Sequence, residues 1–341
     1  MKQPRYFAGI DIASASFMVS IATKPEHVLL GPCSFDNTPE GFKALVDWFE
    51  QNHLSSQQLV ICMEATGVYG ELLCYFLHQH QYTLAVESPL KVKRAFKIDH
   101  HKTDAVDSIQ LAEYAFRFLD ELSIWAPRAE RVEKITSLIS SRELLVREKT
   151  QTMNNLHALR RKVIKSAVAV QSLEKVIQVI EEEIKALEKQ MEYLVEQDPK
   201  INARVDLLKS TPGVGLLLAA NLLVLTNGFT SQRSYRETAS YLKIAPLQYE
   251  SGTSVYRNPQ SPHYGPSVMR KLLSLAAQSV VTHKADFKKY YLRKQAEGKP
   301  KRLILNNVEN KLLKIIWAII RDEKPYIPNY QSVHPKYWKT A

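Results

Sequence analysis

The sequence predicts a mixed α/β domain at the N-terminus, a helical spacer, and a mainly α-helical C-terminal domain. Strand-type and helix-type segments alternate over roughly the first hundred residues. A heptad pattern follows over residues 173–194, and later apolar segments have helical spacing between Gly and Pro turns. A chain of 341 residues can form two or three domains. We expect domains at 1–125, 126–200 and 201–325, with a tail at 326–341.

The N-terminal domain is predicted from apolar runs of two periodicities. The run at 17–22 follows the run at 6–12 after small residues, so we expect the two to form a hairpin. Parallel strand pairs are expected because helices separate the later strands. The strand-type runs cover 6–12, 17–22, 59–63 and 82–86, and the helical segments cover 41–49 and 71–79.

Four carboxylates are the candidate catalytic residues of this domain. Asp11 and Glu64 follow two of the apolar runs, and chemistry in α/β sheets collects at the carboxyl ends of strands. Asp104 and Asp107 lie three residues apart at the start of a helical pattern, so they share a face. Carboxylates held this close need cations between them, and two-metal sites drive phosphodiester chemistry. A solvated acidic first turn favoured by the helix dipole is the alternative interpretation of the Asp pair.

Positive charge is concentrated beside these acids and in the C-terminal third. Between Arg257 and Ala341 there are 17 Lys+Arg against 5 Asp+Glu, so this third carries +12 and the remainder carries −1, for a net charge of +11. Such asymmetry favours a polyanionic partner, although a solvated basic surface would look the same. Next to the acids, we expect a nucleic-acid backbone to contact Lys91, Lys93, Arg94 and Lys102.

Cysteine usage and hydropathy indicate a cytoplasmic protein. Cys33, Cys62 and Cys74 have neither zinc-type spacing nor an even-numbered framework, which fits reduced thiols. The N-terminal apolar run is interrupted by Asp11, and the apolar segment at 216–225 is too short to span a bilayer. We therefore expect no membrane association.

The spacer is predicted to be an antiparallel helical hairpin. Its second helix has a heptad seam and ends at Asp198-Pro199, and we expect the turn near residues 166–172. The seam could be buried within one chain or could pair with a second chain, and the pattern favours neither. The seam residues are Leu173, Ile177, Ile180, Ile184, Leu187, Met191 and Leu194.

The C-terminal domain contains a glycine turn and a serine–glycine turn. The Pro-Gly-Val-Gly turn at 212–215 resembles a helix-hairpin-helix turn, in which Gly213 and Gly215 would let the backbone approach a phosphate. A tight helix connection with no ligand is equally compatible with it. Ser251 precedes a glycine in a polar turn, with no local His or Asp of a hydrolase triad. Basic residues interleaved with aromatic ones suggest nucleic-acid contacts by Lys288, Lys289 and Arg293.

Several segments together resemble the RuvC-like DEDD transposases, the family of the Piv-type invertases and of bridge-RNA-guided insertion-sequence transposases. The segments are Gly9-Ile10-Asp11, Glu64-Ala65-Thr66-Gly67, Lys102-Thr103-Asp104-Ala105-Val106-Asp107 and Pro246-Leu247-Gln248-Tyr249-Glu250-Ser251-Gly252. The resemblance implies an RNase H-like fold, with Asp11, Glu64, Asp104 and Asp107 as ligands of Mg²⁺ or Mn²⁺. It implies that Ser251 becomes covalently joined to DNA. His263 stands where the family usually has Lys, and Ser108 where it often has Ala. Arg270 matches the family's arginine, which implies a nucleic-acid contact there.

The resemblance implies a DNA transposase or site-specific recombinase that acts as a homodimer or tetramer on donor and target DNA. A bridge RNA would pair with both DNAs, and the protein would be nucleoid-associated when active. A Piv-like invertase would share every motif. A metal-dependent nuclease or junction resolvase with water as the nucleophile would also fit these residues, as would a non-catalytic nucleic-acid-binding protein. The target sequence and the guide RNA cannot be read from these residues.

Overall fold

The structure is a computed structural model that describes residues 4–24, 27–65, 67–96, 103–228, 234–251, 255–260 and 265–328, without side-chain surroundings for 247–260. The chain divides into two compact units, residues 1–127 and 128–341. Each unit has a hydrophobic core of its own. Within the described ranges, no helix is both long and apolar enough to cross a membrane. The finer division of the chain into domains stays a prediction.

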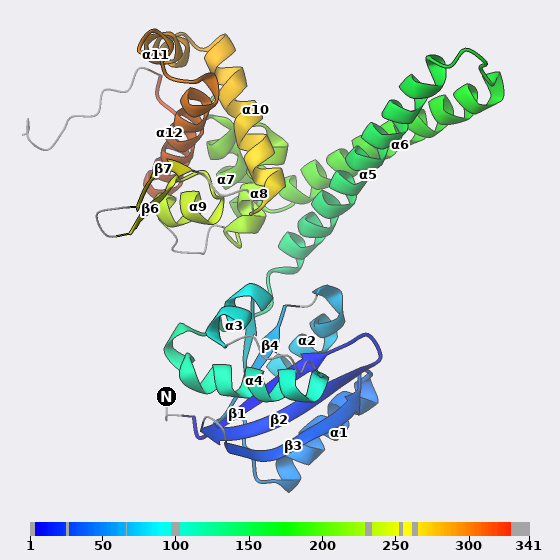
Figure 1. Ribbon diagram of the computed structural model, residues 1–341, viewed down its shortest axis with the longest axis vertical. Helices are drawn as coiled ribbons and strands as arrows, with labels where there is room; N and C mark the ends of the chain where they lie inside the picture. The colour runs from blue at the N-terminus through cyan, green and yellow to red at the C-terminus, as the bar shows by residue number, and fades with distance from the viewer. Residues whose placement is uncertain are drawn as a thin grey trace, which may run out of the picture. The chain divides into compact units, whose positions relative to one another are not determined.

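The first unit is a mixed sheet with helices on both faces (Figure 1). Its five described strands lie in the order β3-β2-β1-β4-β5, antiparallel from β3 to β1 and parallel from β1 to β5. The elements are β1 (Tyr6–Ile12), β2 (Ser16–Lys24), β3 (His27–Asp36), α1 (Pro39–Gln51), β4 (Leu59–Glu64), 3₁₀ turn η1 (Gly67–Gly70), α2 (Glu71–Gln79), β5 (Thr83–Glu87), α3 (Pro89–Ala95), α4 (Asp104–Arg117) and 3₁₀ turn η2 (Leu119–Glu121).

Side-chain alternation along the central strands separates the two faces of the sheet. Ala8 and Ile10 of β1 pack with α1 and α2, whereas Phe7 of β1 packs with α3 and α4. Burial on both faces explains the nearly continuous apolar run of β1. The predicted hairpin of the first two runs is confirmed, because β1 and β2 pair antiparallel. This mixed α/β unit is compatible with an RNase H-like fold.

Strand β3 was missing from the sequence prediction. It lies at the edge of the sheet, is largely exposed, and contains Gly31 and Pro32. Proline is tolerated on an edge strand because the ladder does not need its missing N–H. An exposed strand with a Gly-Pro pair lacks the alternation from which strands are predicted.

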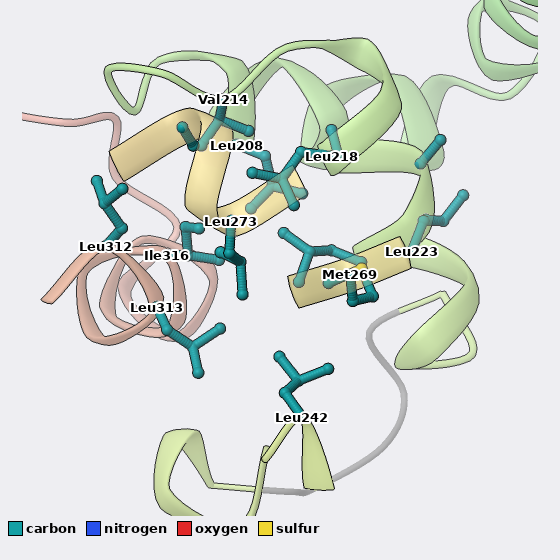
Figure 2. Packing of buried hydrophobic residues seen from close by; sticks show 14 of the residues in the cluster. Leu208, Val214, Leu218, Leu223, Leu242, Met269, Leu273, Leu312, Leu313 and Ile316 are labelled. Carbon is teal, nitrogen blue, oxygen red and sulfur yellow. The ribbon is translucent and has the colours of Figure 1, made fainter. Parts of the chain in front are cut away.

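The second unit is mainly helical and includes one described two-stranded sheet, β6-β7. Its elements are α5 (Glu130–Arg160), α6 (Ala167–Glu196), α7 (Pro199–Lys209), α8 (Leu216–Leu225), α9 (Tyr235–Tyr241), β6 (Leu247–Ser251), β7 (Val255–Gln260), α10 (Ser267–His283), α11 (Ala285–Ala296) and α12 (Lys301–Asp322). The core lies between α8, α10 and α12, where Leu218, Leu273 and Leu312 are buried (Figure 2).

Helices α5 and α6 form the predicted antiparallel hairpin (Figure 1). Arg142 of α5 binds Glu188 of α6 at 2.7 Å. At the base of the hairpin, Ile135 and Met191 belong to the core of the second unit. The turn lies at 161–166, earlier than predicted, because the Ser166 side chain accepts a hydrogen bond from the Ala169 N–H and starts α6 at Ala167. The coiled-coil interpretation of the heptad seam stays a prediction.

Candidate active site

Strand register places Asp11 and Glu64 at the same edge of the sheet. Strands β1 and β4 are parallel neighbours, and Ile10 pairs with Met63 near their carboxyl ends. One further step along both strands puts Asp11 beside Glu64, on strands about 4.8 Å apart. Both residues are half-buried and follow buried strand residues. By alternation both side chains point to the α4 face, because Phe7 of β1 and Cys62 of β4 contact α4 there.

Helix α4 crosses that face with its N-terminus toward the acids. Near its C-terminal end, the ring of Phe116 packs edge-to-face on Phe7, with centroids 5.2 Å apart. Nearer its start, the backbone of α4 touches Gly9, where an added Cβ would lie 2.0 Å from the Ser108 carbonyl oxygen. The helix therefore runs antiparallel to β1, and its first turn lies toward Asp11.

The close approach of α4 to the sheet is fixed by small residues. Gly9 leaves room for the helix backbone, since a Cβ there would also lie 2.3 Å from the Ala112 nitrogen. Beside it, the buried hydroxyls of Ser20 on β2 and Ser108 on α4 are hydrogen-bonded at 2.8 Å. Ser108 stands where the resembling family often has Ala, and its hydroxyl here joins the helix to the sheet.

The first turn of α4 presents the remaining two acids. The Thr103 side chain accepts a hydrogen bond from the Val106 N–H at 3.3 Å and begins the helix at Asp104. Asp104 is exposed and Asp107 is half-buried. The positive end of the helix dipole favours both carboxylates, so this turn is stable with or without a cation.

The four carboxylates therefore gather at one edge without closing on a common point. Among the described residues, no three His, Cys, Asp or Glu side chains are grouped as they would be around a metal ion. The donor set nonetheless fits a hard divalent cation, because all four candidate ligands are carboxylates and Mg²⁺ prefers oxygen donors. Asp11 and Glu64 each make a further interaction.

Asn37 joins the loops that follow the two acidic strands, and sequence reasoning missed it. Its side-chain amide donates to the carbonyl oxygens of Ala13 at 3.0 Å and Tyr69 at 3.1 Å. Ala13 follows β1, and Tyr69 lies in η1, shortly after β4. In the sequence, Asn37 looks like part of the cap that precedes α1, since Thr38 and Pro39 come next. No local signal indicates its partners 24 and 32 residues away.

The basic residues beside the acids have different surroundings. Lys91 binds the buried carboxylate of Glu87 at 3.1 Å and donates to the Glu121 carbonyl oxygen at 2.9 Å. Burial lowers the pKa of Lys91, but its hydrogen bonds to Glu87 and Tyr114 outweigh burial and raise the pKa overall. These contacts account for Lys91 without a nucleic acid. Lys93 and Arg94 are exposed on α3, whereas Lys102 lies outside the described residues.

Ser251 lies in the second unit, at the end of β6. Its backbone pairs with Val255 of β7 across the hairpin. The residues of the hairpin loop and His263 lie outside the described part of the chain. The role of Ser251 stays a prediction, as do the roles of the four carboxylates.

The predicted glycine turn connects α7 and α8. Gly213 has a φ of +80°, and an added Cβ there would lie 2.9 Å from the Ala276 carbonyl oxygen of α10. Close helix packing therefore explains Gly213 without a phosphate. Gly215 faces open space at the start of α8. The other residues predicted to contact nucleic acid differ in burial. Arg270 is half-buried on α10, whereas α11 exposes Lys288, Lys289 and Arg293.

Acidic residues at the carboxyl ends of two adjacent parallel strands, faced by an acidic helix start, are compatible with the class of RNase H-like DNA-processing enzymes. Residues 8–165 match the DEDD transposase model of the IS110 type, and residues 205–292 match the model of the transposase IS116/IS110/IS902 family. The chain belongs to this transposase family, whose members cleave and rejoin DNA.

The chain resembles both invertases and insertion-element proteins. It is 29% identical to the pilin gene-inverting protein of Moraxella lacunata over 94% of this chain and 97% of that protein. It is 24% identical to a "Probable family 20 transposase" of Pseudomonas aeruginosa over 94% of this chain and 98% of that protein. The 43.6 kDa protein of insertion element IS110 from Streptomyces coelicolor is 30% identical over 46% of this chain and 37% of that protein.

Proposed function

We propose that this chain is the transposase of an insertion sequence and exchanges DNA strands through a covalent serine intermediate. The observation that supports this most is the placement of Asp11 and Glu64 by the β1–β4 register, with the acidic start of α4 directed to the same edge. The match to two transposase models supports a DNA phosphodiester as the substrate of that edge.

In this mechanism the two units have separate chemical tasks. The carboxylates of Asp11, Glu64, Asp104 and Asp107 would hold Mg²⁺ or Mn²⁺, which would supply charge neutralisation for the phosphate and stabilisation for the leaving oxygen. The Ser251 hydroxyl attacks the phosphorus, so that an Oγ–P bond forms while the bond to the leaving sugar oxygen breaks. The covalent intermediate keeps the DNA end attached until it is rejoined.

We further propose that a structured RNA selects the DNA sites and that the chain acts as a dimer or tetramer. The family resemblance supports the RNA guide. Within the described residues, no Cys and His group forms a zinc-finger-like site that could read bases. The apolar seam of α6 supports assembly, because beyond the base of the hairpin its residues are only half-buried against α5. Purification under gentle conditions should recover a defined RNA with the protein. A recombinase whose own side chains recognise the DNA sites would carry no such RNA.

Variants of the carboxylates test the proposed metal-binding role of the sheet edge at Asp11 and Glu64. Asp11→Asn and Glu64→Gln should each abolish recombination of a plasmid that carries the DNA flanking the coding region, because an amide is a poor ligand for a divalent cation. Asp120→Asn is the matched control, since Asp120 is an exposed acid in η2 of the same unit. Retained activity in both edge variants would exclude a catalytic role for the edge.

Ser251→Ala distinguishes a serine recombinase from a nuclease. A water-dependent nuclease would still cut DNA, whereas the proposed enzyme would neither cut nor form a protein–DNA adduct. The adduct can be measured on a denaturing gel with labelled DNA. Recombined product from Ser251→Ala would disprove the serine mechanism.

A DNA invertase is the second candidate, because the Moraxella pilin gene-inverting proteins align with nearly the whole chain. Inversion and transposition use the same strand exchange and differ in the arrangement of the DNA sites. Plasmids with the recombination sites in inverted orientation or on separate molecules distinguish the two activities.

A further inference from the structure

A groove lies between α11, α12 and the segment at 325–327, and its lining includes none of the residues to which the mechanism assigns roles. Its volume is about 850 Å³, within the range of pockets that hold small ligands. Phe287 of α11 and Ile319 of α12 are buried in its floor, and Ile315 and Ala318 are half-buried beside them. The floor can therefore receive a flat apolar group.

Two lysines of α12 line the groove, one turn apart. The Lys311 ammonium lies 3.8 Å from the centroid of the Tyr290 ring, and Lys314 lies 5.9 Å from that of Tyr235. Neither ammonium forms an ion pair with a carboxylate in the described part of the chain. The guanidinium of Arg293 also lies 5.5 Å from the Tyr290 ring. The Tyr290 ring is therefore in contact with the cations of Lys311 and Arg293 and is not available to stack on a base.

The electrostatics of these lysines favour an anionic ligand. Partial burial lowers the pKa of Lys311, and the neighbouring charges of Arg293 and Lys294 lower it further. An anion placed between these cations would relieve their mutual repulsion. Two carboxylates also line the groove. Asp322 is already paired with Arg321 at 2.7 Å, and Asp286 lies at the start of α11.

The segment at 325–327 completes the lining of the groove. Tyr326 is half-buried, and its N–H donates to the Ser210 hydroxyl at 2.9 Å, which anchors the segment to the end of α7. Tyr326 and Ile327 line the groove together with the residues of α11 and α12. The result is an apolar slot with cations at its rim and carboxylates that can accept hydrogen bonds from N–H groups.

We propose that this groove binds one unpaired nucleotide of a single-stranded nucleic acid, with its base in the apolar slot and its phosphate on Lys311 and Lys314. A nucleotide combines an anionic phosphate, a flat body and N–H donors, which are the groups that this lining complements. The net charge of +12 from Arg257 to the end of the chain favours such a strand. The proposal rests on the proposed function, because it supplies a contact for a strand that is unpaired during recombination. DNA and RNA share the required chemistry.

The test measures binding of the full chain to fluorescent single-stranded DNA, single-stranded RNA of the same sequence, and the corresponding DNA duplex. The Lys311→Gln/Lys314→Gln double variant should lower the slope of log affinity against log salt by about 0.7 for each lysine on single strands. Lys175→Gln is the control, because Lys175 is an exposed lysine of α6 far along the hairpin. An unchanged slope in the double variant would overturn the proposal.

Ala318→Phe tests the slot without changing charge. It should weaken single-strand binding by roughly tenfold or more and leave duplex binding unchanged. Equal losses on the duplex, or no loss on single strands, would contradict base insertion. For the wild-type chain, photo-crosslinking with thio-substituted pyrimidines should label Phe287 or Tyr326, and labelling elsewhere alone would also count against it.

The two kinds of single strand identify the natural ligand, because the strand that loses more affinity in Ala318→Phe is the one that enters the slot. If the wild-type chain recombines DNA while both groove variants bind like Lys175→Gln, this inference is wrong and the proposed function stands. If the wild-type chain binds no nucleic acid, both are wrong.

Discussion

Substituting Gly9 with Ala should separate helix α4 from the sheet and disable the carboxylate edge. The new Cβ would lie 2.0 Å from the Ser108 carbonyl oxygen, and real Cβ contacts are not shorter than 3.0 Å. The Gly9 Cβ position is fixed by strand β1 and the Ser108 oxygen by helix α4, and neither can rotate away as a side chain can. Helix α4 therefore has to move by about 1 Å, the difference between 2.0 and 3.0 Å. The Ser20–Ser108 hydrogen bond at 2.8 Å would break with it.

The cost of this displacement has a structural and a catalytic part. Overpacking of a close backbone contact destabilises a protein by about 1–3 kcal/mol, which for this unit corresponds to a fall in Tm of roughly 4–15 °C. A misplacement of about 1 Å in catalytic groups can lower the rate by about a hundredfold. Thermal unfolding, monitored by circular dichroism, measures the loss of stability. Plasmid recombination, assayed below the variant's Tm, measures the loss of catalysis.

Gly70→Ala is the matched control for Gly9→Ala. Gly70 is also buried at the carboxylate edge, but its added Cβ would lie closest to the terminal methyl of Met63, at 3.2 Å, which can move, and would be in ordinary contact with the Ile12 side chain at 3.7 Å. We expect nearly wild-type stability and recombination from this control. If Gly9→Ala behaves like Gly70→Ala in both assays, the described contact between α4 and β1 is wrong.

Three further predictions concern other parts of the chain. Asn37→Ala should slow recombination and lower the free energy of unfolding by about 1–2 kcal/mol, because it releases both loops at the edge; an unchanged rate would exclude a positioning role. Arg142→Ala should destabilise the α5–α6 hairpin by about 1–2 kcal/mol in urea titrations, since its side chain is only 15% exposed, whereas Arg160→Ala, with a side chain 57% exposed, should cost about 0.5 kcal/mol or less. Burial raises the pKa of the Cys62 and Cys74 thiols to about 12 from an ordinary 9.0, so iodoacetamide at neutral pH should label only Cys33 in the native chain. Because the unfolded thiols ionise first, their contribution to stability is complete below pH 9.0 and is lost as the pH rises toward about 12.

The N-terminal fold was predictable because its determinants are periodic. The buried runs of β1 and β4 are nearly continuous in apolar residues, and Asp11 and Glu64 stand where those runs end. Parallel pairing then brings the two acids to one edge by geometry alone. The start of α4 was predictable for the same reason, since Thr103 is a typical N-cap before a helical pattern.

The remaining features depend on contacts between distant residues. The role of Gly9 becomes visible only when α4 is placed on β1, and the partners of Asn37 lie in two other loops. Lys91 was predicted to contact phosphate from its charge, but its pairing with Glu87 depends on the burial of that carboxylate. The groove at Lys311 joins two helices and a later segment with no shared sequence motif.

The α5–α6 hairpin packs into the core of the second unit at its base, near Ile135 and Met191, so rotations at the base are amplified at its tip. Ile135, Leu138 and Ile139 hold the base of α5 in the core of the second unit, and the rest of α5 is supported by α6. From Ile139 to Arg160 the helix extends by about 30 Å at 1.5 Å per residue. Each degree of rotation at the base therefore displaces the tip by about half an ångström. A rotation of about ten degrees at the base, where α8 packs against α5, would therefore move the tip by about 5 Å.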